Sequence, residues 1–123
     1  MKIKKFTIPM YDYRVTFVEI EKKDKSKDVK KVCPIINGTD FTKSICSRVK
    51  EKLEDGGEFI YNHRKKECLI LLYLQSSKKR RLETLGHELR HCVDRILKHS
   101  CVSDIESAAL LSGYLTMKLF KST

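Results

Sequence analysis

Residues 67–74, "ECLILLYL", decide how this chain folds, because they contain its longest apolar run. Seven apolar residues match the length of a strand and fall far short of the roughly 18 that a membrane span needs. Successive positions are apolar, which predicts a strand buried on both faces and therefore central in its sheet. The half-polar segment "EFIYNH" (58–63) precedes it across "RKK" (64–66). We therefore expect a hairpin whose first strand forms an exposed edge.

Upstream of this hairpin, the apolar pattern predicts two strands and a helix. Residues 2–8 and 13–20 alternate in polarity and are joined by "PMYD" (9–12), which favours a second pair of strands. From Asp40 the period changes to four residues, and it stops before two glycines at 56 and 57. This change predicts a helix with marked ends, preceded by a charged loop.

Downstream of the hairpin, we expect two helices. The first spans about 79–98, on the apolar spacing of Leu82, Leu85, Leu89, Val93 and Ile96. The second spans about 103–119, with a buried side of Ile105, Ala108, Ala109, Ser112, Leu115 and Leu119. The whole order predicts one α+β domain over residues 1–123, in which a small antiparallel or mixed sheet packs against the helices.

Composition sets the class of protein. The chain has 123 residues and a net charge of +10, from 26 basic and 16 acidic side chains. Its start carries no apolar signal segment, and its five cysteines form no CxxC pair, so we expect a cytoplasmic protein with reduced, mostly buried thiols and no membrane partner. The positive charge suggests nucleic acid as a partner. Only "KKRR" (78–81) is a pure basic cluster, however, and plain solubility is the alternative.

The segment "GHELRHCVDRIL" (86–97) carries the clearest chemical pattern. On a helix, His87 and His91 lie one turn apart on one face, so that both imidazoles reach the same ion. Zinc takes neutral imidazole readily and lowers the pKa of a bound water, whose proton Glu88 is placed to accept. A solvated helix face that happens to contain histidines is the alternative.

A third zinc ligand is needed. In one class of zinc peptidases it is a histidine six residues beyond the second one, but this chain has Leu97 there. His99 would have to bend back from the helix end. Glu106 is better placed, because it shares a stripe of the last helix with small residues such as Gly113, which would let the two helices approach.

Other residues of these helices also bear on the site. Ser103 and Glu106 fit a capping box, which would make Glu106 a cap rather than a ligand. Asp94 lies one turn beyond His91 and could orient a ligand imidazole, or pair with Lys98 instead. Gly86 is costly in mid-helix, so we expect the strand 68–74 to approach it closely.

The motif "HELRH" (87–91), preceded by "EFIYNHRKKECLILLYL" and followed by "DIESAALLSGYL", resembles the zincin metallopeptidases, specifically a minimal form of their glutamate-ligand branch. It is also similar to short HExxH proteins encoded by bacteriophages. The resemblance covers residues 58–116. It implies a minimal zincin-like domain with an edge strand against which an extended peptide substrate lies. That strand would be 58–63, with Phe59, Ile60 and Tyr61 at its centre.

These observations predict a small zinc metallopeptidase that hydrolyses peptide bonds in a peptide or protein substrate, in the host cytoplasm if it is phage-encoded. Its zinc ligands would be His87, His91 and Glu106, with Glu88 as general base. A non-catalytic zincin-like phage structural or accessory protein is one alternative. A nucleic-acid-binding module that uses residues 78–81 is another. The sequence leaves the oligomeric state open.

Overall fold

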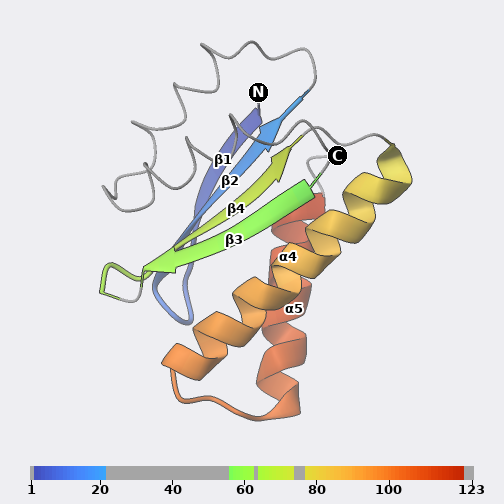
Figure 1. Ribbon diagram of the computed structural model, residues 1–123. Helices are drawn as coiled ribbons and strands as arrows, with labels where there is room; N and C mark the ends of the chain where they lie inside the picture. The colour runs from blue at the N-terminus through green and yellow to red at the C-terminus, as the bar shows by residue number, and fades with distance from the viewer. Residues whose placement is uncertain (1, 22–55, 63, 74–76, 121–123) are drawn as a thin grey trace.

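The computed structural model describes residues 2–21, 56–62, 64–73 and 77–120. The helix expected from Asp40, and the charged loop before it, lie outside these residues. The described elements follow the expected order along the chain (Figure 1). They are β1 (Lys2–Ile8), β2 (Tyr13–Ile20), β3 (Gly56–Asn62), β4 (Glu67–Tyr73), α4 (Lys78–His99) and α5 (Ile105–Phe120).

Four strands form one mixed sheet in the order β1-β2-β4-β3. β1 pairs antiparallel with β2, and β3 pairs antiparallel with β4, so both expected hairpins are confirmed. β2 and β4 pair in parallel, which requires a long crossover between them. As predicted, β4 is central and β3 is an edge strand of the described sheet.

The two helices lie on one face of the sheet (Figure 1). α4 packs against β3 and β4, and α5 packs against α4. α5 also reaches the first strand, since Lys4 Nζ donates to the Lys118 carbonyl at 2.6 Å and the Tyr114 hydroxyl donates to the Thr7 carbonyl at 3.2 Å. The fold is therefore α+β, as expected. Neither described helix combines the length and the apolar character that a membrane crossing would need.

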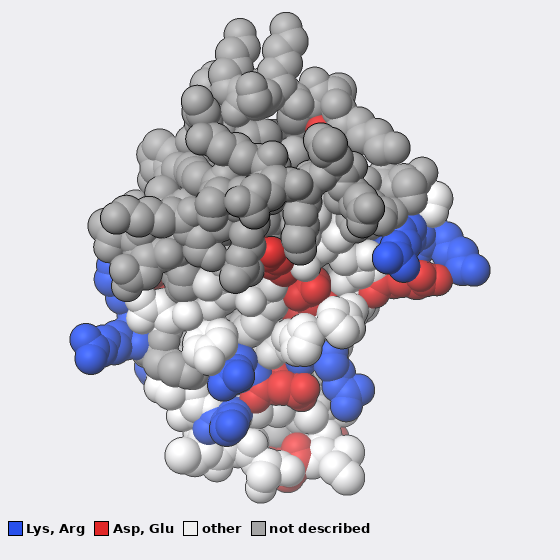
Figure 2. Space-filling view, in the orientation of Figure 1, with Lys and Arg blue, Asp and Glu red and all other residues white. Residues whose placement is uncertain are grey.

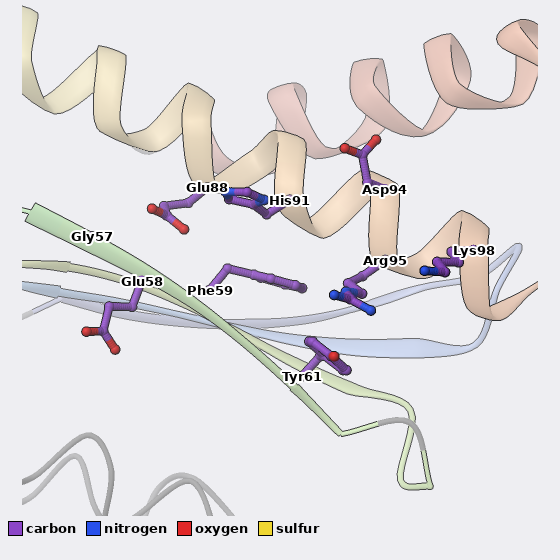
Figure 3. Close-up of a pocket in the computed structure, with 9 residues that line it drawn as sticks. All are labelled: Gly57, Glu58, Phe59, Tyr61, Glu88, His91, Asp94, Arg95 and Lys98. Carbon is purple, nitrogen blue, oxygen red and sulfur yellow. The ribbon is translucent and has the colours of Figure 1, made fainter.

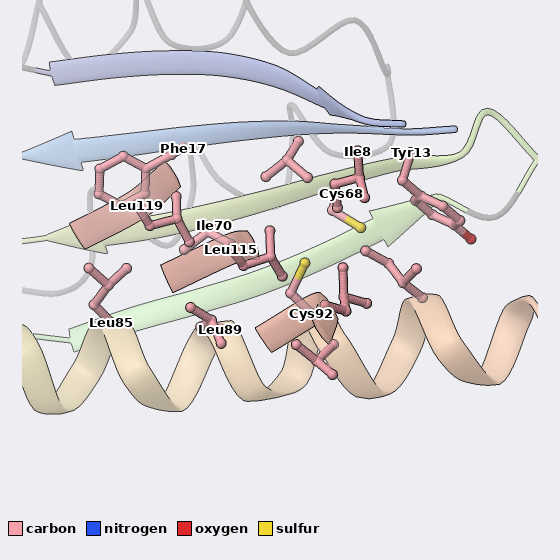
Figure 4. Close-up of a cluster of buried hydrophobic side chains, with 14 of the residues drawn as sticks. Ile8, Tyr13, Phe17, Cys68, Ile70, Leu85, Leu89, Cys92, Leu115 and Leu119 are labelled. Carbon is pink, nitrogen blue, oxygen red and sulfur yellow. The ribbon is translucent and has the colours of Figure 1, made fainter. Parts of the chain in front are cut away.

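The core fills the space between the sheet and the helices (Figure 4). From β4, the side chains of Cys68, Ile70 and Leu72 join this core, and Leu69 and Leu71 are equally buried on the opposite face. Burial on both faces is the arrangement that the unbroken apolar run of β4 predicts.

The two described thiols of the core are free. Cys68 and Cys92 are both buried, while Cys101 is exposed, so the expectation of mostly buried thiols holds for two of the three described cysteines. A hydrogen bond with Cys68, together with burial, raises the pKa of the Cys92 thiol well above its usual range. A thiol held neutral in this way is a packing residue rather than a nucleophile.

α5 is turned about its axis relative to the predicted orientation. Ile105, expected on the buried side, is 88% exposed, and Ala109 is also exposed. Leu115 and Leu119 are buried as predicted, and Leu111 completes the buried stripe. The helix begins one turn before it reaches the core, so its first apolar residue has nothing to pack against in the described part of the chain.

The first turn of α4 is tied to the sheet by a buried ion pair. Arg81 donates to both carboxylate oxygens of Glu19 on β2, at 2.5 and 3.0 Å. The two side chains are 14% and 6% exposed. This bidentate geometry satisfies both groups away from water and fixes where the helix starts over the sheet.

Replacing Arg81 with alanine should lower the free energy of unfolding by about 3–5 kcal/mol, because Glu19 would keep a buried charge without its partner. Urea unfolding followed by circular dichroism measures this loss. Arg80→Ala is the matched control, since Arg80 is largely exposed and its ion pair with Glu83 spans 4.0 Å; it should cost less than about 1 kcal/mol. Equal losses in the two variants would contradict the anchoring role.

Candidate metal centre

The two histidines of the HELRH motif converge on the outer face of α4. Their Nε2 atoms lie 3.0 Å apart, within hydrogen-bonding distance. The ring centroids are 4.6 Å apart, and the ring planes are nearly perpendicular at 88°. Both side chains are exposed, on the side of the helix away from the Leu85 and Leu89 stripe, as predicted.

This separation is close to what a shared metal ion needs. Two nitrogens that each lie 2.0–2.1 Å from one tetrahedral zinc are about 3.3 Å apart. The Nε2 atoms of His87 and His91 approach this spacing with their rings already turned toward each other. A small shift of either ring would therefore let both lone pairs meet one ion, so these two donors fit zinc.

Glu88 differs sharply from the two histidines in its exposure. It is only 6% exposed, although His87 and His91 are both open to water. Burial raises the pKa of the Glu88 carboxyl above its usual range, while His87 and His91 lower it and Glu58 raises it. A carboxylate whose pKa is raised is a stronger base than an ordinary exposed carboxylate, which suits it to accept a proton.

The burial of Glu88 depends on a glycine of β3. A Cβ atom at Gly57 would lie 3.1 Å from Cγ of Glu88 and 2.7 Å from the methyl group of Thr84. The strand backbone therefore lies directly against this part of α4, and the stem of Glu88 packs there. Sequence reasoning used Gly57 only as a helix stop and missed this contact, which depends on the pairing of Gly57 with Leu72.

A pocket of about 560 Å³ opens between β3 and α4 (Figure 3). Glu88 and His91 lie toward one end, and Arg95 and Lys98 lie toward the other. Phe59 and Tyr61 of β3 face it, with Gly57, Glu58 and Asp94 completing the lining.

The edge strand lies where the resemblance places it, beside the pocket. Phe59 and Tyr61 stack with centroids 5.9 Å apart and an angle of 25° between their planes. Ile60 alternates to the other face of the strand and does not line the pocket. The pairing of a substrate with these residues stays a prediction.

The structure does not bring Glu106 to the two histidines. Glu106 is exposed in the first turn of α5, and the described residues contain no group of three or more His, Cys, Asp or Glu side chains that could hold a metal ion. The reason is topological, because α5 runs back along α4 and begins beside its C-terminal end, where Val102 N–H donates to the Leu97 carbonyl (Figure 1). His87 and His91 lie two to three turns away, in the middle of α4.

The small residues of α5 do not face α4 as expected. Gly113 is exposed, and a Cβ atom there would meet no atom of the described residues within 4 Å. The expected capping box is also wrong by one residue. Asp104, rather than Ser103, caps the helix by accepting from Ser107 N–H at 2.8 Å, and this bond lowers the pKa of the Asp104 carboxyl.

The other predicted helpers of the site have different partners. His99 bonds through Nδ1 to the buried hydroxyl of Tyr13, with the two rings in an edge contact. This contact makes His99 part of the packing at the end of α4. Asp94 pairs with Arg90 at 3.9 Å rather than with Lys98. Asp94 is among the residues that line the pocket, but its carboxylate points away from β3 (Figure 3), and an orienting role for it stays a prediction.

Two of the four basic side chains at 78–81 already pair with acidic residues of the protein. Arg81 is locked into its ion pair with Glu19, and Arg80 lies within 4.0 Å of Glu83. On the face shown in Figure 2, basic and acidic side chains of the described residues are interspersed rather than segregated. Both observations count against a phosphate-binding surface built from this cluster.

Comparison with known proteins adds no assignment: no protein-family model, curated protein or solved structure matches the chain. The case for a function therefore rests on the geometry of α4 and β3.

Gly57 and Gly86 make a matched pair of substitutions. Gly57→Ala should cost about 1–3 kcal/mol, because the added methyl group would overlap Thr84 and displace Glu88. Gly86→Ala should stabilise the protein by about 1 kcal/mol, because a methyl group there meets no described atom within 4 Å and alanine favours the helix. The close approach expected at Gly86 was thus wrong. Thermal unfolding measures both changes, and a harmless Gly57→Ala would contradict the packing of β3 against Glu88.

Proposed function

We propose that this protein is a small zinc-dependent metallopeptidase of minimal zincin-like form. One observation carries the proposal: two imidazole nitrogens converge to 3.0 Å directly beside a buried acid, and that acid lies at the end of a pocket beside an edge strand. Surface histidines without a shared function have no reason to flank a buried acid in this way.

The roles follow from position and burial. His87 and His91 would hold the zinc ion through Nε2. When bound, zinc acts as a Lewis acid that lowers the pKa of a neighbouring water toward neutrality. Glu88 would accept the proton of the attacking water and later pass it to the leaving amine. Its raised pKa suits the first transfer, because burial makes the carboxylate a stronger base.

The pocket indicates where a substrate would lie. It runs along β3, the edge strand of the described sheet, and an extended peptide fits beside a strand of this kind. Phe59 and Tyr61 offer apolar ring faces to its side chains. The substrate class in this proposal is accordingly a peptide or an extended segment of a protein.

A non-catalytic zincin-like protein, such as a phage accessory protein, is the second candidate. The observation that favours it is the missing third donor: among the described residues, no His, Cys, Asp or Glu joins His87 and His91. A site with two protein ligands binds zinc more weakly than a complete one. The affinity and the turnover therefore have to be measured separately.

Zinc content tests the metal site. We expect one zinc per chain after dialysis against micromolar zinc, and its loss in His87→Ala and in His91→Ala. His99→Gln is the matched control, because His99 lies on the same helix but bonds to Tyr13. Mass spectrometry under native conditions counts the ion. Zinc retained in both motif variants, or lost equally in His99→Gln, would contradict the assignment.

Replacement of Glu88 by glutamine tests the catalytic step. The variant keeps the shape of the side chain but cannot take up a proton, so cleavage should fall by about 10²–10⁴-fold while zinc stays bound. Glu83→Gln is the control, since Glu83 is exposed on the same helix. Release of amines from a denatured protein mixture measures cleavage. Zinc binding without cleavage by the unmodified protein would favour the non-catalytic candidate.

A further inference from the structure

Two cations occupy the end of the pocket that lies away from Glu88. Arg95 and Lys98 both line it, and the described residues offer neither of them an ion pair. The nearest acid on the helix, Asp94, is paired with Arg90. Positive charge in a pocket without a protein partner is a common sign of a site for an anionic group.

The guanidinium of Arg95 is held in place by an aromatic platform. Its central carbon lies 4.4 Å from the centroid of the Tyr61 ring, and Tyr61 in turn stacks on Phe59 (Figure 3). Stacking uses the flat face of a guanidinium and leaves the N–H donors at its rim available. A fixed fork of donors of this kind matches the two oxygens of a carboxylate.

The positions of Arg95 and Lys98 along α4 set how far a bound carboxylate lies from Glu88 and His91. Arg95 is one turn beyond His91, a rise of about 6 Å, and Lys98 lies about 4.5 Å further on. An extended peptide advances about 3.3 Å per residue. A carboxylate bound here therefore lies two to three residues along the peptide from a bond that is placed next to Glu88 and His91.

The two ends of the pocket have opposite charge. Glu88 lies at one end, while Arg95 and Lys98 lie at the other, and the Glu58 side chain points away from the pocket on the other side of β3 (Figure 3). A peptide that carries a carboxylate near one end would enter in a single direction, because the reverse orientation would place that carboxylate beside Glu88 and away from the two cations.

We propose that Arg95, assisted by Lys98, binds a carboxylate of the substrate and so selects peptides that carry an acidic side chain or a free C-terminus two to three residues from the cleaved bond. The selection of a cleavage site rests on the proposed peptidase function. The binding of the carboxylate needs neither zinc nor turnover.

The binding experiment uses the Glu88→Gln protein, so that no probe is consumed. The probes are fluorescein-labelled hexa-alanine peptides in three forms: amidated, amidated with one glutamate scanned along the chain, and with a free C-terminus. Fluorescence anisotropy gives their affinities. At least one of the two carboxylate forms should bind about tenfold tighter than the amidated peptide, and the two forms distinguish a side-chain carboxylate from a terminal one. Equal affinities, or no measurable binding of either form, would overturn the proposal.

Variants locate the carboxylate site. Arg95→Gln should abolish the tenfold preference, Arg95→Lys should restore part of it, and Lys98→Gln should reduce it. Lys79→Gln is the control for the loss of one positive charge, since Lys79 is exposed in the first turn of α4 and should leave the preference intact. A preference that survives both Arg95→Gln and Lys98→Gln would show that the carboxylate binds elsewhere.

The result also separates this inference from the proposed function. If a chelator removes all zinc and the preference remains, carboxylate binding stands even when no peptide is cleaved. If the unmodified protein cleaves peptides with and without carboxylates equally well, the peptidase proposal stands and the carboxylate site fails.

Discussion

The close approach of β3 to α4 at Gly57 is the constraint on which the candidate site depends. Because this residue has no side chain, the strand backbone lies against Glu88 and Thr84, and the Glu88 side chain becomes buried. His87 and His91 lie beyond this contact and remain exposed. A single packing contact thus creates the difference in environment between the two histidines and the acid beside them, and the burial of Glu88 raises its pKa.

The helix that carries these groups is held at both ends. Arg81 binds Glu19 of β2 at its first turn, and His99 contacts Tyr13 at its last. Between these anchors the core residues of α4 pack on β4, so the outer face has a fixed position over the edge strand. Fixed ends make the pocket a preformed feature rather than one that a substrate must create, and preformed sites lose less free energy on binding.

The sequence was most informative where one physical effect dominated. The run at 68–74 has no polar position to expose, so a central strand is the only sheet position that suits it, and the structure confirms this. The spacing of His87 and His91 needs only a helix to bring the rings together, and α4 provides it. Patterns within a single element were therefore enough to place β4 at the centre of the sheet and to bring the two histidines together, whereas the parallel pairing of β2 with β4 was not predicted.

Predictions failed where they required the orientation of one element relative to another. Ile105 was expected on the buried side of α5 and Gly113 at its contact with α4, but both are exposed, because the burial of Leu111, Leu115 and Leu119 sets which side of the helix faces the core. Glu106 lies away from the histidines for a different reason, because α5 begins beside the C-terminal end of α4. The sequence also did not predict the cation end of the pocket. Arg95 of α4 stacks on the Tyr61 ring of β3, and this contact depends on how the helix and the strand pack together.

The central claim is that His87 and His91 share one ion, and X-ray absorption at the zinc edge tests it most directly. In protein loaded with one zinc per chain, the account predicts nitrogen or oxygen ligands at about 2.0–2.1 Å with the scattering pattern of two imidazoles. In His91→Ala, the imidazole scattering should be weaker. Sulfur ligands at about 2.3 Å, or a zinc spectrum without imidazole scattering, would contradict it.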